Sequence, residues 1–117
     1  KELCGNEYIR FDSEDPRIIN ELRRRGVRGI GAKKGPGSVE RGIHWLQELT
    51  AIVIDPQRTP NCAREFQGYE HKRDKDGNFI AAYPDKDNHV IDATRYSAED
   101  LVAERAIRTI NRAELGI

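Results

Sequence analysis

Short runs of strand-forming residues alternate with helical apolar stripes through the first half of the chain. The strand candidates are residues 8–12, 27–32 and 51–54, and the helical stripes begin at Pro16 and Ser38. Ile and Leu recur in the helical runs at intervals of three and four residues, as the buried face of a helix requires. A β-α-β-α-β order of this kind is typical of α/β domains.

Capping residues mark where the two helices begin and where the first one ends. Ser13 to Asp15 offer N-caps, and Pro16 suits the first helical turn. Gly26 follows three arginines, as a C-terminal glycine follows a basic last turn. Ser38 comes after a Gly-Pro-Gly loop at residues 35–37 and is expected to cap the second helix.

The second half of the chain predicts three helices and a hairpin. A short helix is expected over residues 59–67, with Thr59 as its cap. A hairpin is expected to turn at the Asp-Lys-Asp-Gly segment of residues 74–77. One helix then begins near Asn88, and a further helix covers about residues 98–113.

The composition describes one small domain with a thin core. The 117 residues include 20 Lys plus Arg and 20 Asp plus Glu, and 37% of them are hydrophobic. No apolar run approaches the ~20 residues that cross a bilayer, which excludes a membrane-spanning protein. Cys4 and Cys62 form no Cys-x-x-Cys pair. They therefore argue against a zinc ribbon or a disulfide scaffold and for two reduced thiols.

The zero net charge hides an uneven distribution of charged residues. Seven cations and a single anion, Glu21, lie between Arg17 and Lys34, whereas acids gather at residues 12–15 and 85–92. A basic band beside acidic clusters suits a polyanionic substrate and a metal site. A charge run that merely keeps one face solvated is an equally good interpretation of the charges alone.

Two glycine-containing segments are similar to ligand-binding motifs but depart from them. Residues 29–35 place Lys34 where a dinucleotide motif has its third glycine, and they lack the Gly-Lys-Ser/Thr ending of a phosphate loop. Lys33 and Lys34 are nevertheless suited to face a phosphate backbone, because a helix N-terminus follows. Residues 74–77 lack the further ligands of a calcium loop, so a hairpin turn is favoured there.

Two carboxylates and a histidine are the candidate catalytic residues. His89 and Asp92 lie three residues apart and share one face of the predicted helix, so they can bind one metal or orient one water. A helix-terminal His beside an exposed Asp is the non-functional alternative. Asp12 ends a predicted strand, at the sheet edge where α/β proteins gather ligands. Carboxylates so placed can hold the two metals of phosphodiester hydrolysis, and oxygen ligands favour Mg²⁺ or Mn²⁺.

Three ordered segments carry a family resemblance. The most specific is Asn-His-x-x-Asp-Ala-x-Arg-Tyr at residues 88–96, supported by Asp-Ser-x-x-Pro at 12–16 and Lys-Gly-x-Gly-Ser at 34–38. With these segments, the chain from about residue 9 to residue 96 resembles the C-terminal nuclease domain of the terminase large subunit of tailed bacteriophages or prophages.

The resemblance implies an RNase H-like α/β fold, with a mixed sheet flanked by helices, and a two-metal endonuclease that uses Mg²⁺ or Mn²⁺. The implied site residues are the metal-binding acids Asp12 and Asp92, His89 near the metals, and Lys33, Lys34 and Ser38 on the loop beside the active site. The basic band, including Arg24, Arg25 and Arg28, is expected to meet the DNA backbone.

The implied function is cleavage of concatemeric double-stranded DNA during genome packaging, in the cytoplasm of the bacterial host. The terminase small subunit and the portal protein are the implied partners of the full-length protein. One departure stands out, because the family's first acid lies on the first strand and no acid before Asp12 suits that place. We therefore expect residues 1–117 to be a single domain, the later part of the nuclease domain. It would lack the first strands of the sheet and the ATPase domain, and would cleave DNA poorly or not at all by itself.

Two alternative functions stay open at this point. The chain could be a non-catalytic DNA-binding or assembly module of the packaging motor, which would bind DNA in a salt-dependent way without cleaving it. It could also be another RNase H-like enzyme, such as a resolvase or a transposase, which a strand-transfer assay would reveal.

Overall fold

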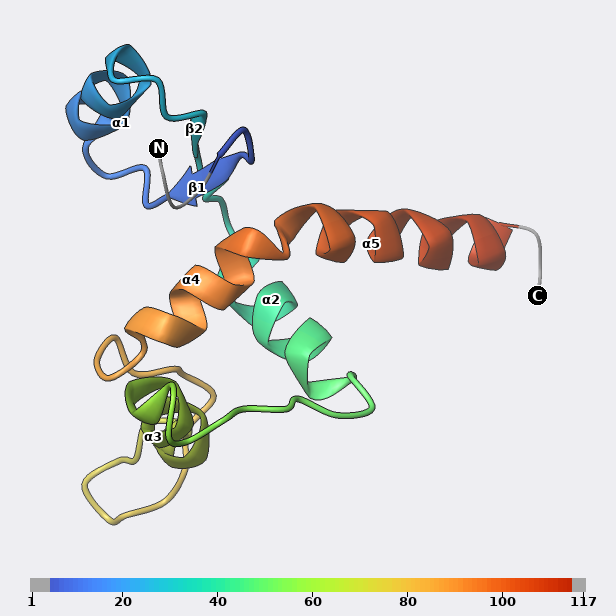
Figure 1. Cartoon of the computed structure of the whole chain (residues 1–117). Helices are drawn as coiled ribbons and strands as arrows, with labels where there is room; N and C mark the ends of the chain where they lie inside the picture. Colours follow the sequence, from blue (N-terminus) through green and yellow to red (C-terminus); the bar gives the residue numbers. More distant parts are fainter. Residues whose placement is uncertain (1–4, 115–117) are drawn as a thin grey trace. The chain divides into compact units, whose positions relative to one another are not determined.

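A computed structural model of the chain describes residues 5–114, so the predicted thiol of Cys4 lies outside the described residues. The chain divides into two compact units, the first formed by Lys1–Thr50 with Ala93–Ile117 and the second by Ala51–Asp92. Figure 1 traces their helices and strands in sequence order.

A parallel β-α-β element forms the start of the first unit. Strand β1 (Ile9–Phe11) pairs with strand β2 (Gly29–Gly31), with Ile9 opposite Gly29 and Phe11 opposite Gly31. Helix α1 (Pro16–Arg24) connects the two strands, which lie side by side in Figure 1. The predicted strand–helix–strand order is thereby confirmed for this part of the chain. The two glycines of β2 leave room for apolar side chains, since a Cβ at Gly29 would lie 3.0 Å from the Phe11 ring.

Helix α1 begins and ends at the predicted residues. The Asp15 carboxylate accepts a hydrogen bond from the Arg17 backbone N–H at 3.0 Å, and Pro16 occupies the first turn. Arg23 and Arg24 lie in the last turn, where cations face the negative end of the helix dipole. Gly26 then takes a φ of 88°, a left-handed conformation that glycine adopts without strain. Ile19 is the buried residue of this helix.

Three further helices belong wholly or partly to the first unit. They are α2 (Ser38–Gln47), α4 (His89–Ser97), within which the boundary between the units falls, and α5 (Glu99–Glu114). Ile43 and Leu46 give α2 its buried stripe. The prediction that Ser38 caps α2 is wrong, because Ser38 is the first helical residue. Gly37, with a φ of 76°, occupies the N-cap position instead.

The second unit contains helix α3 (Pro60–Gly68) and a hairpin turn. Thr59 precedes α3 as predicted, but its hydroxyl donates to the Asp55 backbone oxygen at 2.7 Å and does not cap the helix. The hairpin turns at Asp74 to Gly77, as expected, and holds an antiparallel bridge between Arg73 and Phe79.

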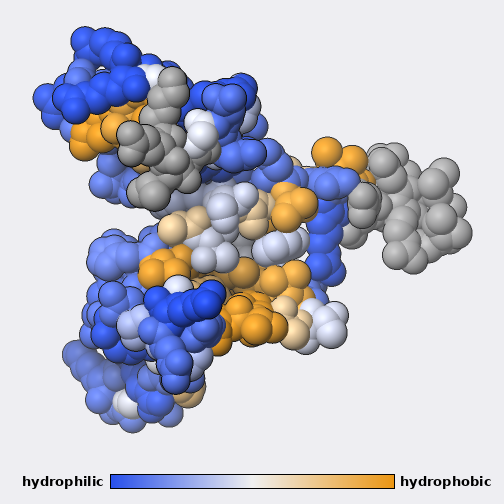
Figure 2. Space-filling model, in the orientation of Figure 1, coloured by the Kyte–Doolittle hydropathy of each residue, from blue (hydrophilic) through white to orange (hydrophobic). Residues whose placement is uncertain are grey.

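The predicted strand at residues 51–54 is wrong. No regular structure forms there, and Val53 is 94% exposed, because no described strand pairs with this segment and its backbone lacks ladder hydrogen bonds. Ile52 is exposed as well. Figure 2 shows apolar residues, in orange, among the hydrophilic residues of the face in view. Among the described residues, no helix is both long and apolar enough to span a membrane.

Candidate active site

The carboxylate of Asp12 lies just after β1 and is held by two donors. The Lys34 ammonium lies 2.5 Å from Asp12 Oδ1, and the backbone N–H of Glu14 donates to the same oxygen at 3.2 Å. The hydrogen bond from Lys34 is the main cause that lowers the pKa of Asp12, and the same bond raises the pKa of Lys34. Both groups are therefore charged at neutral pH and form an ion pair.

The backbone that carries Lys34 is anchored on two sides. Ala32 N–H donates to the Phe11 carbonyl at 2.8 Å, and Lys33 N–H donates to Glu99 Oε2 at 3.0 Å. The other oxygen of Glu99 accepts from the Arg10 guanidinium, which also pairs with Asp100. The loop after β2 is thus tied to β1 and to the start of α5 before its cationic side chains begin.

A small pocket of about 190 Å³ lies beside this loop within the first unit. Its lining includes Lys33, Ser38 and the buried Arg95, which is only 9% exposed. The aliphatic part of Arg95 crosses α2 at Gly42, where a Cβ would lie 2.8 Å from Arg95 Cδ. Gly42 therefore permits the close approach that brings a buried cation to the pocket.

Helix α4 carries His89 and Asp92, and its start is capped from α3. The Glu65 carboxylate accepts the backbone N–H groups of Val90 at 2.6 Å and Ile91 at 3.2 Å. Glu65 is itself only 7% exposed. A buried carboxylate at a helix N-terminus satisfies free N–H groups and faces the positive end of the helix dipole. This cap fixes the residue at which the helix begins, and so fixes the common face of His89 and Asp92.

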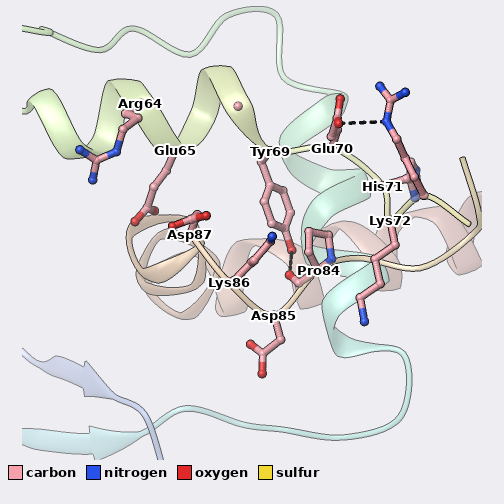
Figure 3. Close-up of a pocket in the computed structure, with 12 residues that line it drawn as sticks. Arg64, Glu65, Tyr69, Glu70, His71, Lys72, Pro84, Asp85, Lys86 and Asp87 are labelled. Carbon is pink, nitrogen blue, oxygen red and sulfur yellow. Dashed lines mark hydrogen bonds and ion pairs between the residues drawn. The ribbon is translucent and has the colours of Figure 1, made fainter. Parts of the chain in front are cut away.

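A pocket of about 850 Å³ lies in the second unit (Figure 3). Asp85 and Asp87 line it from the segment before α4, and Arg64 and Glu65 line it from α3. The Tyr69 hydroxyl donates to the Pro84 backbone oxygen at 2.8 Å and joins the two sides. The pocket therefore gathers both carboxylates that precede the His89–Asp92 segment.

The structure brings some of the expected site residues together. Asp12 meets Lys34, and Ser38 shares a pocket with Lys33, all within the first unit. His89 and Asp92 lie on one helix in the second unit. Among the described residues, no three His, Cys, Asp or Glu side chains form a group that could hold a metal ion.

The arginines of the expected DNA-binding band lie on the surface with partners of their own. Arg24 and Arg25 pair with Glu21 at 3.2 and 3.0 Å. Arg28 donates to the Asn6 carbonyl at 2.9 Å and stacks over the Tyr8 ring at 3.9 Å. Exposed pairs of this kind are weak and exchange readily for other anions, so these contacts leave the arginines able to meet a phosphate backbone.

Several structural partners of the site were missed in the sequence, namely Arg10, Gly42, Glu65, Arg95 and Glu99. Glu65 is 25 residues from Val90, and Arg10 is 89 residues from Glu99. Their pairing depends on the fold, so local spacing carries no signal for it. Of these residues, Arg95 lies in residues 88–96, the most specific of the three segments that carry the family resemblance.

Comparison with known proteins defines the class of this chain. The family model described as the terminase RNAseH like domain matches residues 4–100. The chain therefore belongs to the family of terminase RNAseH-like domains, and the expected RNase H-like α/β fold is confirmed.

Individual relatives are terminase large subunits. The chain is 58% identical over 90 residues to the terminase large subunit of Bacillus phage SPP1, which covers 75% of this chain and 21% of that protein. It is 30% identical over 94 residues to the PBSX phage terminase large subunit of Bacillus subtilis strain 168, covering 80% and 22%.

A solved structure is also similar to this chain. The crystal structure of the large terminase nuclease domain from bacteriophage SPP1 with bound Mn matches with a TM-score of 0.73 and 55% identity. It covers 80% of this chain and 54% of that one. The chain thus spans about half of that nuclease domain and about a fifth of the curated relatives.

Proposed function

We propose that this chain supplies part of the metal-dependent endonuclease site of a phage or prophage terminase large subunit. Its substrate would be concatemeric double-stranded DNA, cut during genome packaging in the host cytoplasm. The observation that carries the proposal is the ionised Asp12 carboxylate at the carboxyl end of β1, in a chain 55% identical to a nuclease domain solved with bound Mn. In the full-length protein, the terminase small subunit and the portal protein are the proposed partners.

The donor chemistry of the proposed residues fits a hard divalent cation. Asp12 and Asp92 would hold Mn²⁺ or Mg²⁺ through carboxylate oxygens, and His89 would support the metal shell or orient a water. A metal pair bound there would activate water and stabilise the leaving oxygen of a phosphodiester. The described residues bring together no group of three such ligands, so water and phosphate oxygens would complete the shell. We therefore expect this chain alone to bind metal weakly and to cleave DNA poorly.

The cationic residues would position the DNA. Lys33, Lys34 and Ser38 lie on the loop after β2 and at the start of α2, where a helix N-terminus adds favourable polarity for phosphate. Arg24, Arg25 and Arg28 would extend the contact along the backbone. Contacts of this kind fix register and orientation without reading base sequence.

Mn²⁺ titration of the labelled chain, followed by NMR, tests the proposal. Paramagnetic broadening should be centred on residues next to Asp12, His89 and Asp92, and Asp12→Asn or Asp92→Asn should reduce it. Asp76→Asn, on the hairpin turn, is the matched control and should leave the broadening unchanged. Broadening that spreads over surface acids, and that none of the three variants alters, would contradict the proposed site.

A non-catalytic DNA-binding role is the second candidate, and the lack of a three-ligand group among the described residues favours it. Salt-dependent binding of duplex DNA, with no Mn²⁺ broadening at Asp12 or Asp92, would support that role over the nuclease.

A further inference from the structure

Lys34 occupies an oxygen that a metal ion would need. Its ammonium lies 2.5 Å from Asp12 Oδ1 and 3.7 Å from Glu14 Oε1. The Glu14 N–H donates to the same Asp12 oxygen, so Oδ1 already accepts two hydrogen bonds. A divalent cation and the ammonium are both positive and cannot share this oxygen without strong repulsion.

The pair is exposed enough to be exchanged. The side chain of Lys34 is 38% exposed and that of Asp12 is 52% exposed. Ion pairs at such positions are weak, because water screens the charges and two side chains must be held in one geometry. A phosphate oxygen of DNA can therefore replace Asp12 as the partner of Lys34, since charge-assisted bonds to phosphate are of similar strength.

The movement that exchange requires is confined to one side chain. The backbone before Lys34 is held by the Ala32 bond to β1 and by the Lys33 bond to Glu99. The Lys34 ammonium also lies 5.9 Å from the Tyr96 ring, within the range of a cation–π contact. The ammonium can thus leave Asp12 while the loop itself stays in place.

We infer that Lys34 couples DNA binding to metal binding. Without DNA, its ammonium neutralises Asp12 and disfavours a metal there. When a DNA phosphate takes the ammonium, the Asp12 oxygen becomes free for the metal. By thermodynamic linkage, a bound metal must then favour DNA to the same degree. This inference rests on the proposed function, because it takes Asp12 as a metal ligand.

Calorimetric titration of Mn²⁺ into the full chain without DNA tests whether Lys34 disfavours a metal at Asp12. Lys34→Met should tighten the Mn²⁺ dissociation constant roughly three- to ten-fold, since one ion pair and one repulsive charge are removed. Lys34→Arg retains the charge and should behave as the unmodified chain. Lys33→Met removes the adjacent charge without breaking the bond to Asp12, and we expect less than a two-fold gain.

Fluorescence anisotropy with a short labelled duplex tests whether metal binding and DNA binding favour each other through Lys34. Mn²⁺ should improve duplex affinity in the unmodified chain relative to Asp12→Asn, and Lys34→Met should reduce that difference, because only direct ligation of phosphate by the metal then remains. Equal Mn²⁺ affinities for Lys34→Met and Lys33→Met would overturn the inference, as would an unchanged difference in the duplex assay.

The same experiments distinguish a wrong proposed function from a wrong role for Lys34. Asp12 is not a metal ligand if Asp12→Asn leaves Mn²⁺ binding unchanged, or if neither the unmodified chain nor Lys34→Met binds Mn²⁺. Either result would contradict both the proposed nuclease site and the coupling role of Lys34. If Asp12→Asn abolishes Mn²⁺ binding but Lys34→Met does not alter it, only the coupling role of Lys34 is wrong.

Discussion

The carboxylate of Glu65 on α3 accepts the backbone N–H of Val90 on α4 at 2.6 Å. It also accepts the N–H of Ile91 at 3.2 Å, so one buried side chain satisfies two free donors at the start of the helix. The segment with His89 and Asp92 therefore depends on a residue far from it in sequence.

Glu65→Gln should destabilise the chain by about 1–3 kcal/mol, because a charged acceptor of two buried N–H groups becomes a neutral amide. Thermal unfolding measures the loss, and hydrogen exchange at Val90 and Ile91 should speed up. Glu70→Gln is the control, since Glu70 is exposed and its carboxylate pairs with Arg73 at the surface. Equal stability of the two variants would mean that the cap contributes nothing.

Gly42→Ala should cost about 1–3 kcal/mol, because the new Cβ would lie 2.8 Å from Arg95 Cδ in a packed region. Denaturant unfolding measures the change in free energy. Gly68→Ala is the matched control, since a Cβ at Gly68 meets nothing within 4 Å and alanine favours the helix. A Gly42→Ala chain as stable as Gly68→Ala would show that α2 and Arg95 separate easily.

Lys34→Met should raise the pKa of Asp12 towards its ordinary value, because the hydrogen bond from Lys34 is the main cause that lowers it. A lowered pKa in the folded state means that the pair stabilises the fold above about pH 4, and that this contribution disappears as the pH falls through the lowered pKa. Since both side chains are partly exposed, the contribution should stay below about 1 kcal/mol. Carbon-13 NMR titration of the Asp12 carboxyl measures the pKa, and the same curve in both proteins would refute the pairing.

Neutralising one arginine of the expected DNA-binding band should weaken duplex binding equally for all sequences. Arg25→Gln should reduce the slope of log affinity against log salt by about one, as expected for one lost phosphate contact. Anisotropy titrations at several salt concentrations measure the slope. Lys75→Met, on the hairpin turn, removes the same charge outside the band and should leave the slope nearly unchanged. A slope that falls equally in both variants would point to a diffuse field in place of a defined contact.

The sequence predicted the elements whose bounds depend on residues close to one another in the chain. Asp15, Pro16 and Gly26 gave the bounds of α1 because caps act within a few residues. The strand predicted at residues 51–54 does not form, because β-branched residues favour a strand only where a partner strand accepts their hydrogen bonds.

In the candidate site too, the sequence indicated single residues but not the contacts between them. Asp12 and Lys34 were both noted in the sequence, yet their contact joins residues 22 apart and follows from the parallel pairing of β1 and β2. Neither spacing nor family pattern revealed it. The roles of Asp12, Asp92 and His89 at the metal stay predictions.

The two hydrogen-bonded oxygens of Glu99 affect how fast Lys34 can leave Asp12. One accepts from Arg10 and the other from the Lys33 N–H, so the base of the loop is fixed before Lys34 is reached. Release of Asp12 is then a rotamer change, which in exposed side chains takes picoseconds to nanoseconds, whereas loop rearrangements take nanoseconds to microseconds. If Lys34 exchanges partners as inferred, we expect the arrival of the competing ion by diffusion, and not a loop rearrangement, to limit the rate.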